Sequence, residues 1–261
     1  MRSYPSSLST LMTSHITRAI VTGHTRGLGA ALAEQLLSRN IAVLALSRSR
    51  NAALAQRYPQ TLDEVELDLA DPASVARWIA GDALRRFVDG AHRVLLFNNA
   101  GTVQPIGPLE TQDAAAIASA VGLNLATPLM LASAVAAASV TASDRRIVHI
   151  SSGAGRNAYP GWSIYCATKA ALDHHARAVV LDANRALRIC SVAPGVVDTN
   201  MQAEIRGSGE EKFPLREKFE ALKRNGQLVS PEQCATQLID FALSDAFGET
   251  PVADIREISV S

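Results

Sequence analysis

Short runs of aliphatic residues alternate along this chain with longer segments whose apolar positions recur at helical spacing. Most of the short runs are apolar at consecutive positions, which is typical of strands buried on both faces. We expect seven strands, near residues 19–22, 41–46, 64–67, 93–98, 146–151, 188–193 and 253–259. We expect six helical segments between them, near residues 28–40, 51–58, 71–84, 113–138, 163–184 and 230–243. This order predicts a single α/β domain, with a doubly wound, seven-stranded and mainly parallel sheet that carries helices on both faces.

One stretch breaks this alternation. Residues 200–230 follow the sixth expected strand and mix glycine, serine and charged residues before the next helix. Because open α/β sheets bind their ligands beyond the carboxyl ends of the strands, we expect this stretch to form a substrate lid. Residues 1–15 are rich in serine and threonine and lack the apolar core of a secretory signal. We expect them to be a disordered extension, which leaves residues 16–261 as the folded domain.

Composition narrows the range of partners and locations. The formal net charge is zero, so the chain has no broad attraction to nucleic acid or to anionic lipid. No apolar run approaches the roughly 18 residues that span a bilayer. The three cysteines, Cys166, Cys190 and Cys234, are odd in number and lack metal-ligand spacing. We therefore expect a cytoplasmic protein with reduced thiols, no nucleic-acid or membrane partner and no bound metal.

Three glycines follow the first expected strand in the segment "TGHTRGLG", residues 22–29. Glycine permits a tight turn and a close approach of the backbone to a ligand. The helix that begins there offers unpaired N–H groups and a partial positive charge to a pyrophosphate. A plain tight turn is the alternative, but the strand, turn and helix in this order favour dinucleotide binding.

Further short motifs follow the glycine spacing G-x-x-x-G-x-G along the chain. They are "DLAD" at 68–71, "NNAG" at 98–101, Asn124, "ISSGAG" at 150–155, "YCATK" at 165–169 and "PGVVDT" at 194–199. Together they resemble the short-chain dehydrogenase/reductase (SDR) family over nearly the whole chain. The resemblance implies a Rossmann fold and a nicotinamide-dependent oxidoreductase.

The end of the second expected strand favours NADP(H) over NAD(H). NAD-binding relatives usually carry an acidic residue there, whereas this chain has Ser47 followed by Arg48. Arg48 and Arg26 could bind a 2′-phosphate through charge-assisted hydrogen bonds, although both could instead be solvated surface side chains. With the resemblance, the expected NADP(H) contacts are Gly23, Thr25, Arg26, Gly27, Leu28, Gly29, Ser47, Arg48, Asp68, Leu69, Asn99, Ala100, Gly101, Tyr165, Lys169, Pro194, Gly195, Val197 and Thr199.

Tyr165 and Lys169 are four residues apart in an expected helix, so their side chains share a face. An ammonium near a phenol favours the phenolate, and we expect Lys169 to lower the pKa of Tyr165. The resemblance makes Tyr165 the proton donor to a substrate carbonyl. It assigns Ser152, with the neighbouring Ser151 as the alternative, to hold the carbonyl oxygen. It also assigns Asn124 to hold a water in a proton relay to Lys169.

The motifs are most similar to the benzil reductase and sepiapterin reductase branch of the family. The expected substrate contacts are Ser152, Gly155, Tyr159, Trp162, Met201 and Asp254. We expect NADPH-dependent reduction of a diketone or aryl ketone to the hydroxy ketone or alcohol. The alternatives are reduction of a pterin side-chain ketone, where Asp254 would grip the pterin, and a non-catalytic redox sensor that only binds NADP.

The resemblance also implies a homodimer or homotetramer joined through the helices that follow the fourth and fifth strands. Alanine-rich faces around Ala134 and Ala176 would allow close packing there. His174 and His175 are adjacent, so they point in different directions from a helix and make poor joint metal ligands. We expect His149 on the fifth strand to be a packing residue.

Overall fold

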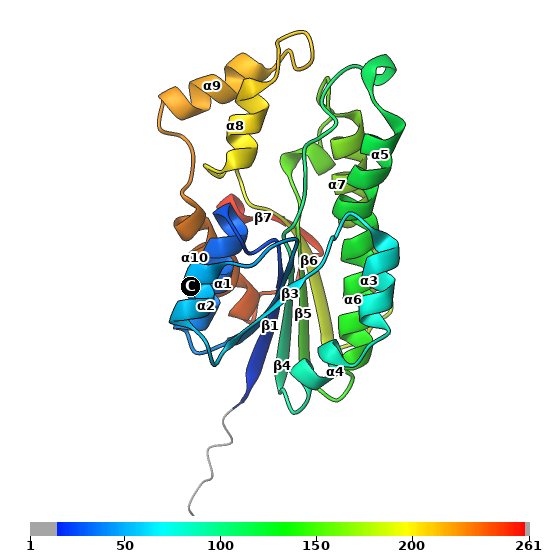
Figure 1. Ribbon diagram of the computed structural model, residues 1–261, viewed down its shortest axis with the longest axis vertical. Coiled ribbons are helices and arrows are strands. Elements are labelled where there is room, and N and C mark those ends of the chain that lie inside the picture. Colours follow the sequence, from blue (N-terminus) through cyan, green and yellow to red (C-terminus); the bar gives the residue numbers. More distant parts are fainter. Residues whose placement is uncertain (1–14, 259–261) are drawn as a thin grey trace, which may run out of the picture.

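The structure, a computed structural model, describes residues 15–258 as one sheet with helices on both faces (Figure 1). The expected extension, residues 1–15, lies outside the described residues except for its last position. The strands are β1 (Thr17–Thr22), β2 (Ala42–Ser47), β3 (Leu62–Glu66), β4 (Arg93–Asn98), β5 (Asp144–Ile150), β6 (Leu187–Ala193) and β7 (Val252–Asp254). All pair in parallel, in the order β3-β2-β1-β4-β5-β6-β7. The predicted doubly wound sheet is confirmed, and its order reverses between β1 and β4, where such folds bind ligands.

Two groups of helices sandwich the sheet. The helices are α1 (Gly27–Ser38), α2 (Ala52–Arg57), α3 (Pro72–Ile79), α4 (Ala83–Val88), α5 (Ala114–Val121), α6 (Thr127–Ala138), α7 (Ser163–Val180), α8 (Asn200–Gly207), α9 (Arg216–Arg224) and α10 (Pro231–Leu243). Apolar residues of α1, α2 and α10, such as Leu32 and Leu238, are buried against one face. Residues of α3, α4, α6 and α7, such as Val75 and Leu131, are buried against the other. Each such leucine contributes about 2 kcal/mol of burial free energy, so these two layers hold the domain together.

Two of the expected helical segments are irregular. The segment 71–84 divides into α3 and α4. The segment 113–138 is continuous, but a π-helical segment at Gly122–Ala126 separates α5 from α6. A Cβ atom on Gly122 would lie 2.7 Å from the carbonyl oxygen of Ala70, so the helix can approach that loop only because the residue is glycine. Single π turns of this kind often occur at functional sites.

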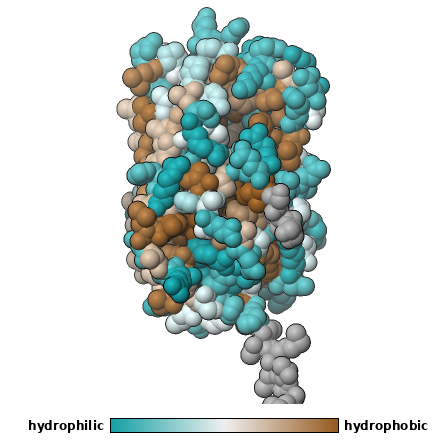
Figure 2. All heavy atoms as spheres, turned by 180° about the vertical axis from the view of Figure 1, so that it is seen from behind, coloured by the Kyte–Doolittle hydropathy of each residue, from teal (hydrophilic) through white to brown (hydrophobic). Residues whose placement is uncertain are grey.

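Residues Ala114–Ala138 form a continuous helical segment of 25 residues. Its mean hydropathy of 1.6 and its length would allow it to cross a membrane. The expectation that no run approaches that length is therefore wrong. Core helices of water-soluble proteins satisfy the same test, and here Leu131 and Val135 pack in the core beside the sheet. Viewed from behind, hydrophobic residues gather along the side of the molecule that carries these helices (Figure 2). Length and composition therefore identify no membrane span by themselves.

The carboxyl-terminal strand is shorter than expected. Residues 253–259 were expected to continue a strand, but β7 ends at Asp254 and a 3₁₀ turn, Ile255–Glu257, follows. The Asp254 carboxylate accepts a hydrogen bond from the backbone N–H of Arg256 (3.1 Å). Such a local side-chain to backbone bond competes with the sheet and turns the chain away from it.

The segment 200–230 carries α8 and α9 above the carboxyl ends of the strands (Figure 1). Its side chains Ile205, Phe213 and Phe219 are buried with Trp162 in a cluster of their own, separate from the two clusters that cover the sheet. The segment thus lies where the lid was expected.

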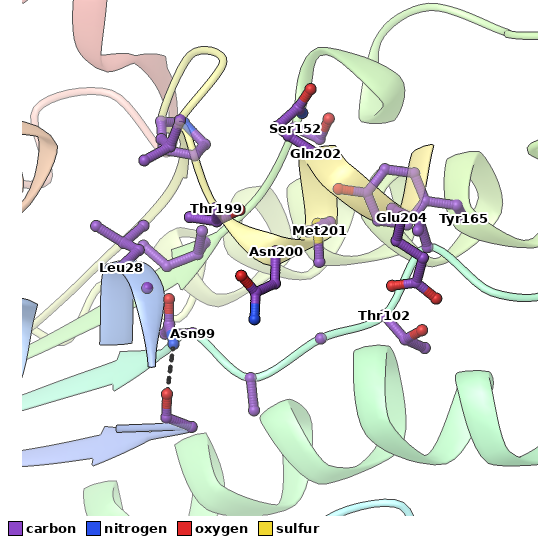
Figure 3. Close-up of a pocket in the computed structure, with 18 of the residues that line it drawn as sticks. Leu28, Asn99, Thr102, Ser152, Tyr165, Thr199, Asn200, Met201, Gln202 and Glu204 are labelled. Carbon is purple, nitrogen blue, oxygen red and sulfur yellow. Dashed lines mark hydrogen bonds between the residues drawn. The ribbon is translucent and has the colours of Figure 1, made fainter. Parts of the chain in front are cut away.

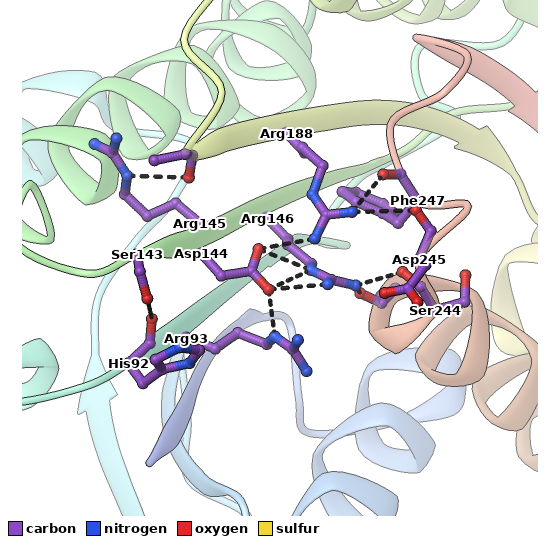
Figure 4. A network of polar contacts seen from close by, with 12 residues as sticks. His92, Arg93, Ser143, Asp144, Arg145, Arg146, Arg188, Ser244, Asp245 and Phe247 are labelled. Atoms are coloured by element: carbon purple, nitrogen blue, oxygen red, sulfur yellow. Dashed lines mark hydrogen bonds and ion pairs between the residues drawn. The ribbon is translucent and has the colours of Figure 1, made fainter. Parts of the chain in front are cut away.

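A network of arginines closes the opposite end of the sheet (Figure 4). Asp144, at the start of β5, accepts hydrogen bonds from Arg93 (2.6 Å) and Arg188 (3.1 Å). Arg146 is 1% exposed and bonds both carboxylate oxygens (3.0 Å each), while its Nη1 donates to two carbonyl oxygens at the end of α10 (2.7 Å each). Burial raises the pKa of Asp144, but the hydrogen bonds from Arg146 and Arg93 outweigh it and hold the pKa well below its usual range. Every charge in this network therefore has a partner.

Candidate active site

A cavity of about 1090 Å³ opens at the carboxyl ends of the strands, between the glycine-rich turn and α8 and α9 (Figure 3). Every residue expected to bind the cofactor lines it. Of the expected substrate contacts, the residues that line it are Ser152, Tyr159, Trp162, Met201 and Asp254. One cavity therefore joins the expected cofactor and substrate regions.

Gly155 is the exception, because it lies outside the lining of the cavity. A Cβ atom there would lie 2.9 Å from Oδ2 of Asp173 and 3.0 Å from the carbonyl of Lys169. The missing side chain thus lets the 3₁₀ turn Gly153–Gly155 approach α7 closely. Gly155 packs the turn against the helix, and a contact of Gly155 with substrate stays a prediction.

The glycine-rich turn has the geometry of a phosphate cradle. Gly23 and Gly27 adopt positive φ angles of 74° and 55°, and a Cβ on Gly29 would lie 2.0 Å from the carbonyl oxygen of Gly23. Asn99 holds the turn, since its Nδ2 donates to the carbonyl oxygen of Thr22 (2.9 Å). No side chain caps the N-terminus of α1, so its N–H groups remain available to a ligand. These features fit the pyrophosphate of a dinucleotide.

The adenosine end of the cavity is cationic. Arg26 and Arg48 are exposed and line it beside Ser47. Within residues 15–258 neither arginine has a carboxylate within 4.0 Å, whereas the next arginine, Arg50, is paired with Glu66. Two arginines without acidic partners at this end fit a phosphate monoester.

Ser152, Tyr165 and Lys169 converge in the middle of the cavity. Ser152 lies two residues after the end of β5, where its hydroxyl accepts a hydrogen bond from the backbone N–H of Ala154 (3.1 Å), and the hydroxyl of Tyr165 points into the cavity (Figure 3). The Lys169 ammonium donates to the carbonyl oxygen of Ile150 (2.8 Å) and lies 5.6 Å from the centre of the Tyr165 ring. All three residues line the cavity, whereas the hydroxyl of the alternative, Ser151, donates to Asp173 (2.6 Å); the catalytic roles stay predictions.

Burial is the largest influence on the pKa values of Tyr165 and Lys169. It raises the pKa of Tyr165 to about 12, although the hydrogen bond with Ser152 acts in the opposite direction. It lowers the pKa of Lys169 to about 8, although the charge of Asp173 opposes this shift. The expectation that Lys169 lowers the pKa of Tyr165 is wrong for this structure, because desolvation of the phenolate outweighs the nearby ammonium.

Asn124 lies in the π-helical segment and is 1% exposed. Its amide group holds the backbone of Thr102 through two hydrogen bonds of 2.8 Å each. A Cβ on Gly101 would lie 3.2 Å from Oδ1 of Asn124 and 3.7 Å from Nζ of Lys169, so the asparagine and the lysine meet at this glycine. The Asn124 side chain therefore shapes the backbone beside Lys169, and its role in a proton relay stays a prediction.

Aromatic side chains form the substrate side of the cavity. Trp162 is 4% exposed and stacks on Phe213, with ring centres 4.5 Å apart. Tyr159 and Tyr165 meet its edge at 5.7 and 5.2 Å. The indole of Trp162 thus lines the cavity and also packs the segment 200–230 against the rest of the domain.

Asp254 lines the cavity but is already engaged. Its two carboxylate oxygens accept from Nε (2.8 Å) and Nη2 (2.7 Å) of Arg256, and Arg156 lies 3.8 Å away. The Arg256 guanidinium lowers the pKa of Asp254, so the carboxylate stays charged within this ion pair. A cationic or guanidine-like ligand would have to displace Arg256 to reach it.

Other residues of the cavity were not anticipated. Gln104, after β4, donates to Glu204 of α8 (2.8 Å), so the segment 200–230 is fastened across the opening. The further unpredicted lining residues of that segment include Gln202, Ile205, Lys218, Phe219 and Leu222. No sequence motif predicts these residues, because they come close to the strand ends only in the folded chain. The helical periodicity of residues 200–230 was the one feature of the sequence that could have indicated them.

The expected packing role of His149 is confirmed. His149 is fully buried between Asn98 and His175 (3.1 Å each), and burial lowers its pKa to about 3, so it packs as a neutral residue. No cluster of metal-ligating side chains is found in the described part of the chain. Ala176 is 0% exposed and packs in this chain's own core, so it is not itself available to a partner, and the expected oligomer stays a prediction.

Comparison with known proteins places this geometry in a family. Residues 17–209 match the family model described as short chain dehydrogenase. A benzil reductase of Bacillus cereus, (S)-benzoin forming, is 36% identical over 91% of this chain and 98% of its own length. A sepiapterin reductase of Mus musculus is 31% identical over 87% of this chain and 92% of its own length.

A solved structure agrees with these matches. A short-chain dehydrogenase/reductase from Burkholderia vietnamiensis is 57% identical, covers 94% of this chain and 99% of its own, and superposes with a TM-score of 0.69. Sequence and fold therefore lead to the same family. The chain belongs to the short-chain dehydrogenase/reductase family, whose members are oxidoreductases that use a nicotinamide cofactor.

Proposed function

We propose that this chain is an NADPH-dependent carbonyl reductase that converts a benzil-like diketone to the hydroxy ketone, or an aryl ketone to the alcohol. The observation that carries the proposal is that Ser152, Tyr165 and Lys169 line one cavity that runs back to the glycine-rich turn. Two relatives, from Bacillus cereus and Bacillus subtilis, are named benzil reductases and match at 36% and 32% identity.

The glycine-rich turn and the N-terminus of α1 would hold the pyrophosphate, and Arg26 and Arg48 would hold the 2′-phosphate. An acidic side chain in place of Arg48 would repel that phosphate, so NADP(H) is the expected cofactor. Once bound, the cofactor supplies the hydride for reduction of a carbonyl carbon.

The side chains supply the proton and the orientation. Ser152 would donate a hydrogen bond to the carbonyl oxygen, where negative charge develops. Tyr165 would then transfer its hydroxyl proton to that oxygen, so that the carbonyl becomes an alcohol. Because burial raises the pKa of Tyr165 to about 12, the phenol holds its proton at neutral pH until the more basic alkoxide forms. Lys169 would stabilise the resulting phenolate.

The walls of the cavity favour an aromatic diketone over a pterin. Trp162, Tyr159 and Phe219 offer apolar faces on which phenyl rings can pack. A pterin would be expected to pair its guanidine-like edge with Asp254, but Arg256 already bonds both oxygens of that carboxylate. Pterin reduction is therefore the weaker candidate.

The test is a steady-state assay of cofactor oxidation, with NADPH and with NADH, on benzil, an aliphatic ketone and a pterin diketone. We expect the highest kcat/KM for benzil with NADPH, and loss of that rate in Tyr165→Phe. A faster aliphatic ketone would contradict the aromatic site, and a faster pterin would contradict the reading of Asp254. Tight NADPH binding without turnover on any carbonyl would favour the redox sensor.

A further inference from the structure

A buried carboxylate lies one helical turn beyond Lys169. Asp173 of α7 is 1% exposed. Its Oδ1 accepts hydrogen bonds from the hydroxyls of Ser151, at the end of β5 (2.6 Å), and of Ser191, on β6 (2.7 Å). One carboxylate oxygen therefore ties the ends of two strands to the helix that carries Tyr165. Ser152 directly follows one of these anchor points.

The second oxygen of Asp173 has a different environment. Oδ2 is buried without a hydrogen-bond partner among the described residues and faces the 3₁₀ turn at Gly155. Burying a charged oxygen without a full set of hydrogen bonds is costly. An asparagine could accept the same two hydroxyl bonds through its amide oxygen, but its NH2 group would then be buried without a partner. The two hydroxyl bonds use only Oδ1, so the charge of the carboxylate needs a separate explanation.

Lys169 provides that explanation. Its side chain is 5% exposed, its ammonium bonds the neutral carbonyl oxygen of Ile150, and no carboxylate lies within 4.0 Å of it in residues 15–258. Asp173 lies four residues after Lys169, on the same face of α7, and its negative charge raises the pKa of Lys169. The protonated form of Lys169 is thus stabilised by a carboxylate that forms no ion pair with it.

Three buried titratable groups around this pair are neutral near pH 7, and the one cation nearby is paired elsewhere. Tyr165 on α7 has a pKa raised to about 12 by burial, and Cys190 on β6, which faces Asp173, has its pKa raised to about 12 in the same way. His149 on β5, which faces Lys169, has a pKa lowered to about 3 by burial. Arg156, beyond Cys190, is paired with Asp254. Asp173 is therefore the one negative charge facing Lys169 among the described residues.

We propose that Asp173 is a positioning residue that keeps Lys169 protonated and fixes the strand end that carries Ser152. The inference deepens the proposed reductase function and rests on it for the activity readout. The charge of Asp173 acts through Lys169, and its two hydroxyl bonds act through the strand ends. Neither contact reaches the substrate.

The four lysines of this chain make a direct test possible. Lys212, Lys218 and Lys223 all lie exposed in the segment 200–230 and serve as internal references. Carbon-13 labelling of lysine, with Lys169→Arg to assign the signal, gives the titration of Lys169 by NMR without cofactor or substrate. We expect Asp173→Asn to lower the pKa of Lys169 by about one unit or more. Ser191→Ala, which keeps the carboxylate, should leave it within a few tenths.

The pH profile gives a second readout. If protonated Lys169 is needed, activity is lost as pH rises through its pKa, so a lower pKa moves that loss to lower pH. Asp173→Asn should be near wild type at pH 6 and reduced about fivefold or more at pH 8. An equal loss at every pH, with an unmoved Lys169 titration, would mean that Asp173 is only structural and would overturn the proposal.

Two further outcomes are distinguishable. If the asparagine variant does not fold, Asp173→Ser is a second neutral variant in which the same shift of Lys169 is expected. If wild type reduces no carbonyl, the proposed function fails, but the NMR titration still decides the role of Asp173. An unchanged Lys169 pKa in any folded neutral variant contradicts the inference.

Discussion

Two carboxylates near opposite ends of β5, the partly buried Asp144 and the buried Asp173, have very different partners. Asp144, at its amino end, is bonded by three arginines, and the buried Arg146 among them also satisfies backbone carbonyls. Asp173, near its carboxyl end, has two hydroxyl donors, one oxygen without a partner and a lysine that it does not touch. Fully paired buried charges hold a fold together, whereas incompletely paired ones are kept where chemistry uses them. The sheet thus has a structural end and a reactive end.

The largest effect is expected at the reactive end. Tyr165→Phe removes the hydroxyl that would donate the proton, and we expect kcat with NADPH and benzil to fall by about 10³-fold or more. Fluorescence titration should show that NADPH binding is retained. Tyr159→Phe, the matched control on the same cavity, should keep kcat within a few-fold. A Tyr165→Phe enzyme with substantial activity would remove the basis for calling this end reactive.

The next largest effect concerns the structural end. Asp144→Ala leaves three arginines without their acid, including Arg146, and we expect the free energy of unfolding to fall by about 3 to 5 kcal/mol. Denaturant unfolding measures this change. The control is Asp82→Ala, which removes the exposed ion pair with Arg85 and should cost less than about 1 kcal/mol. An equal loss of unfolding free energy in the two variants would show that the Asp144 network stabilises the fold no more than an exposed ion pair does.

Acid should reveal the same network. The folded pKa of Asp144 lies well below the unfolded value of about 4, so its stabilisation is present above pH 4 and is lost as pH falls toward the folded pKa. Unfolding curves of wild type between pH 5 and 2 should therefore converge with those of Asp144→Ala. Curves that stay parallel down to pH 2 would show that Asp144 does not contribute in this way.

A smaller effect is expected at the cofactor end of the cavity. Arg48→Asp should raise KM for NADPH about 10- to 100-fold and improve use of NADH, because the carboxylate repels a 2′-phosphate and can bond a ribose diol. Arg50→Asp is the control, since Arg50 is paired with Glu66. An unchanged ratio of NADPH to NADH efficiency would mean that Arg48 is only a solvated surface residue.

The smallest effect sharpens the substrate assignment. Arg256→Gln frees Asp254 from its strongest partner, so we expect a few-fold lower KM for a pterin diketone and little change for benzil. Competition between the two substrates measures this directly. A loss of benzil activity in this variant would indicate that Arg256 itself contacts the substrate.

The sequence predicts the fold well because its signals are local. Consecutive aliphatic residues give six strands to within two residues at each end, and the spacing of Gly23, Gly27 and Gly29 gives the cradle. The residues that the motifs predict for the site line the cavity, with two exceptions, Asn124 and Gly155. That glycine packs against Asp173 and Lys169, a contact that no pattern around residue 155 encodes.

What the sequence does not predict depends on burial and on distant partners. The i, i+4 spacing of Tyr165 and Lys169 favours a lowered phenol pKa, but the depth of the site reverses the sign. The engagement of Asp254 by Arg256 requires the turn after β7. The π-helical segment at Asn124 likewise depends on the packing of Gly122 against Ala70.

The central claim is that the reactive end transfers a hydride and a proton to one carbonyl of an aromatic diketone. The most direct test is a reaction of benzil with NADPH that carries deuterium at one face of nicotinamide C4, followed by mass spectrometry of the benzoin. We expect one deuterium on the carbinol carbon from one labelled face only, and no product from Tyr165→Phe. Benzoin without deuterium from either face, or no benzoin at all, would contradict the claim.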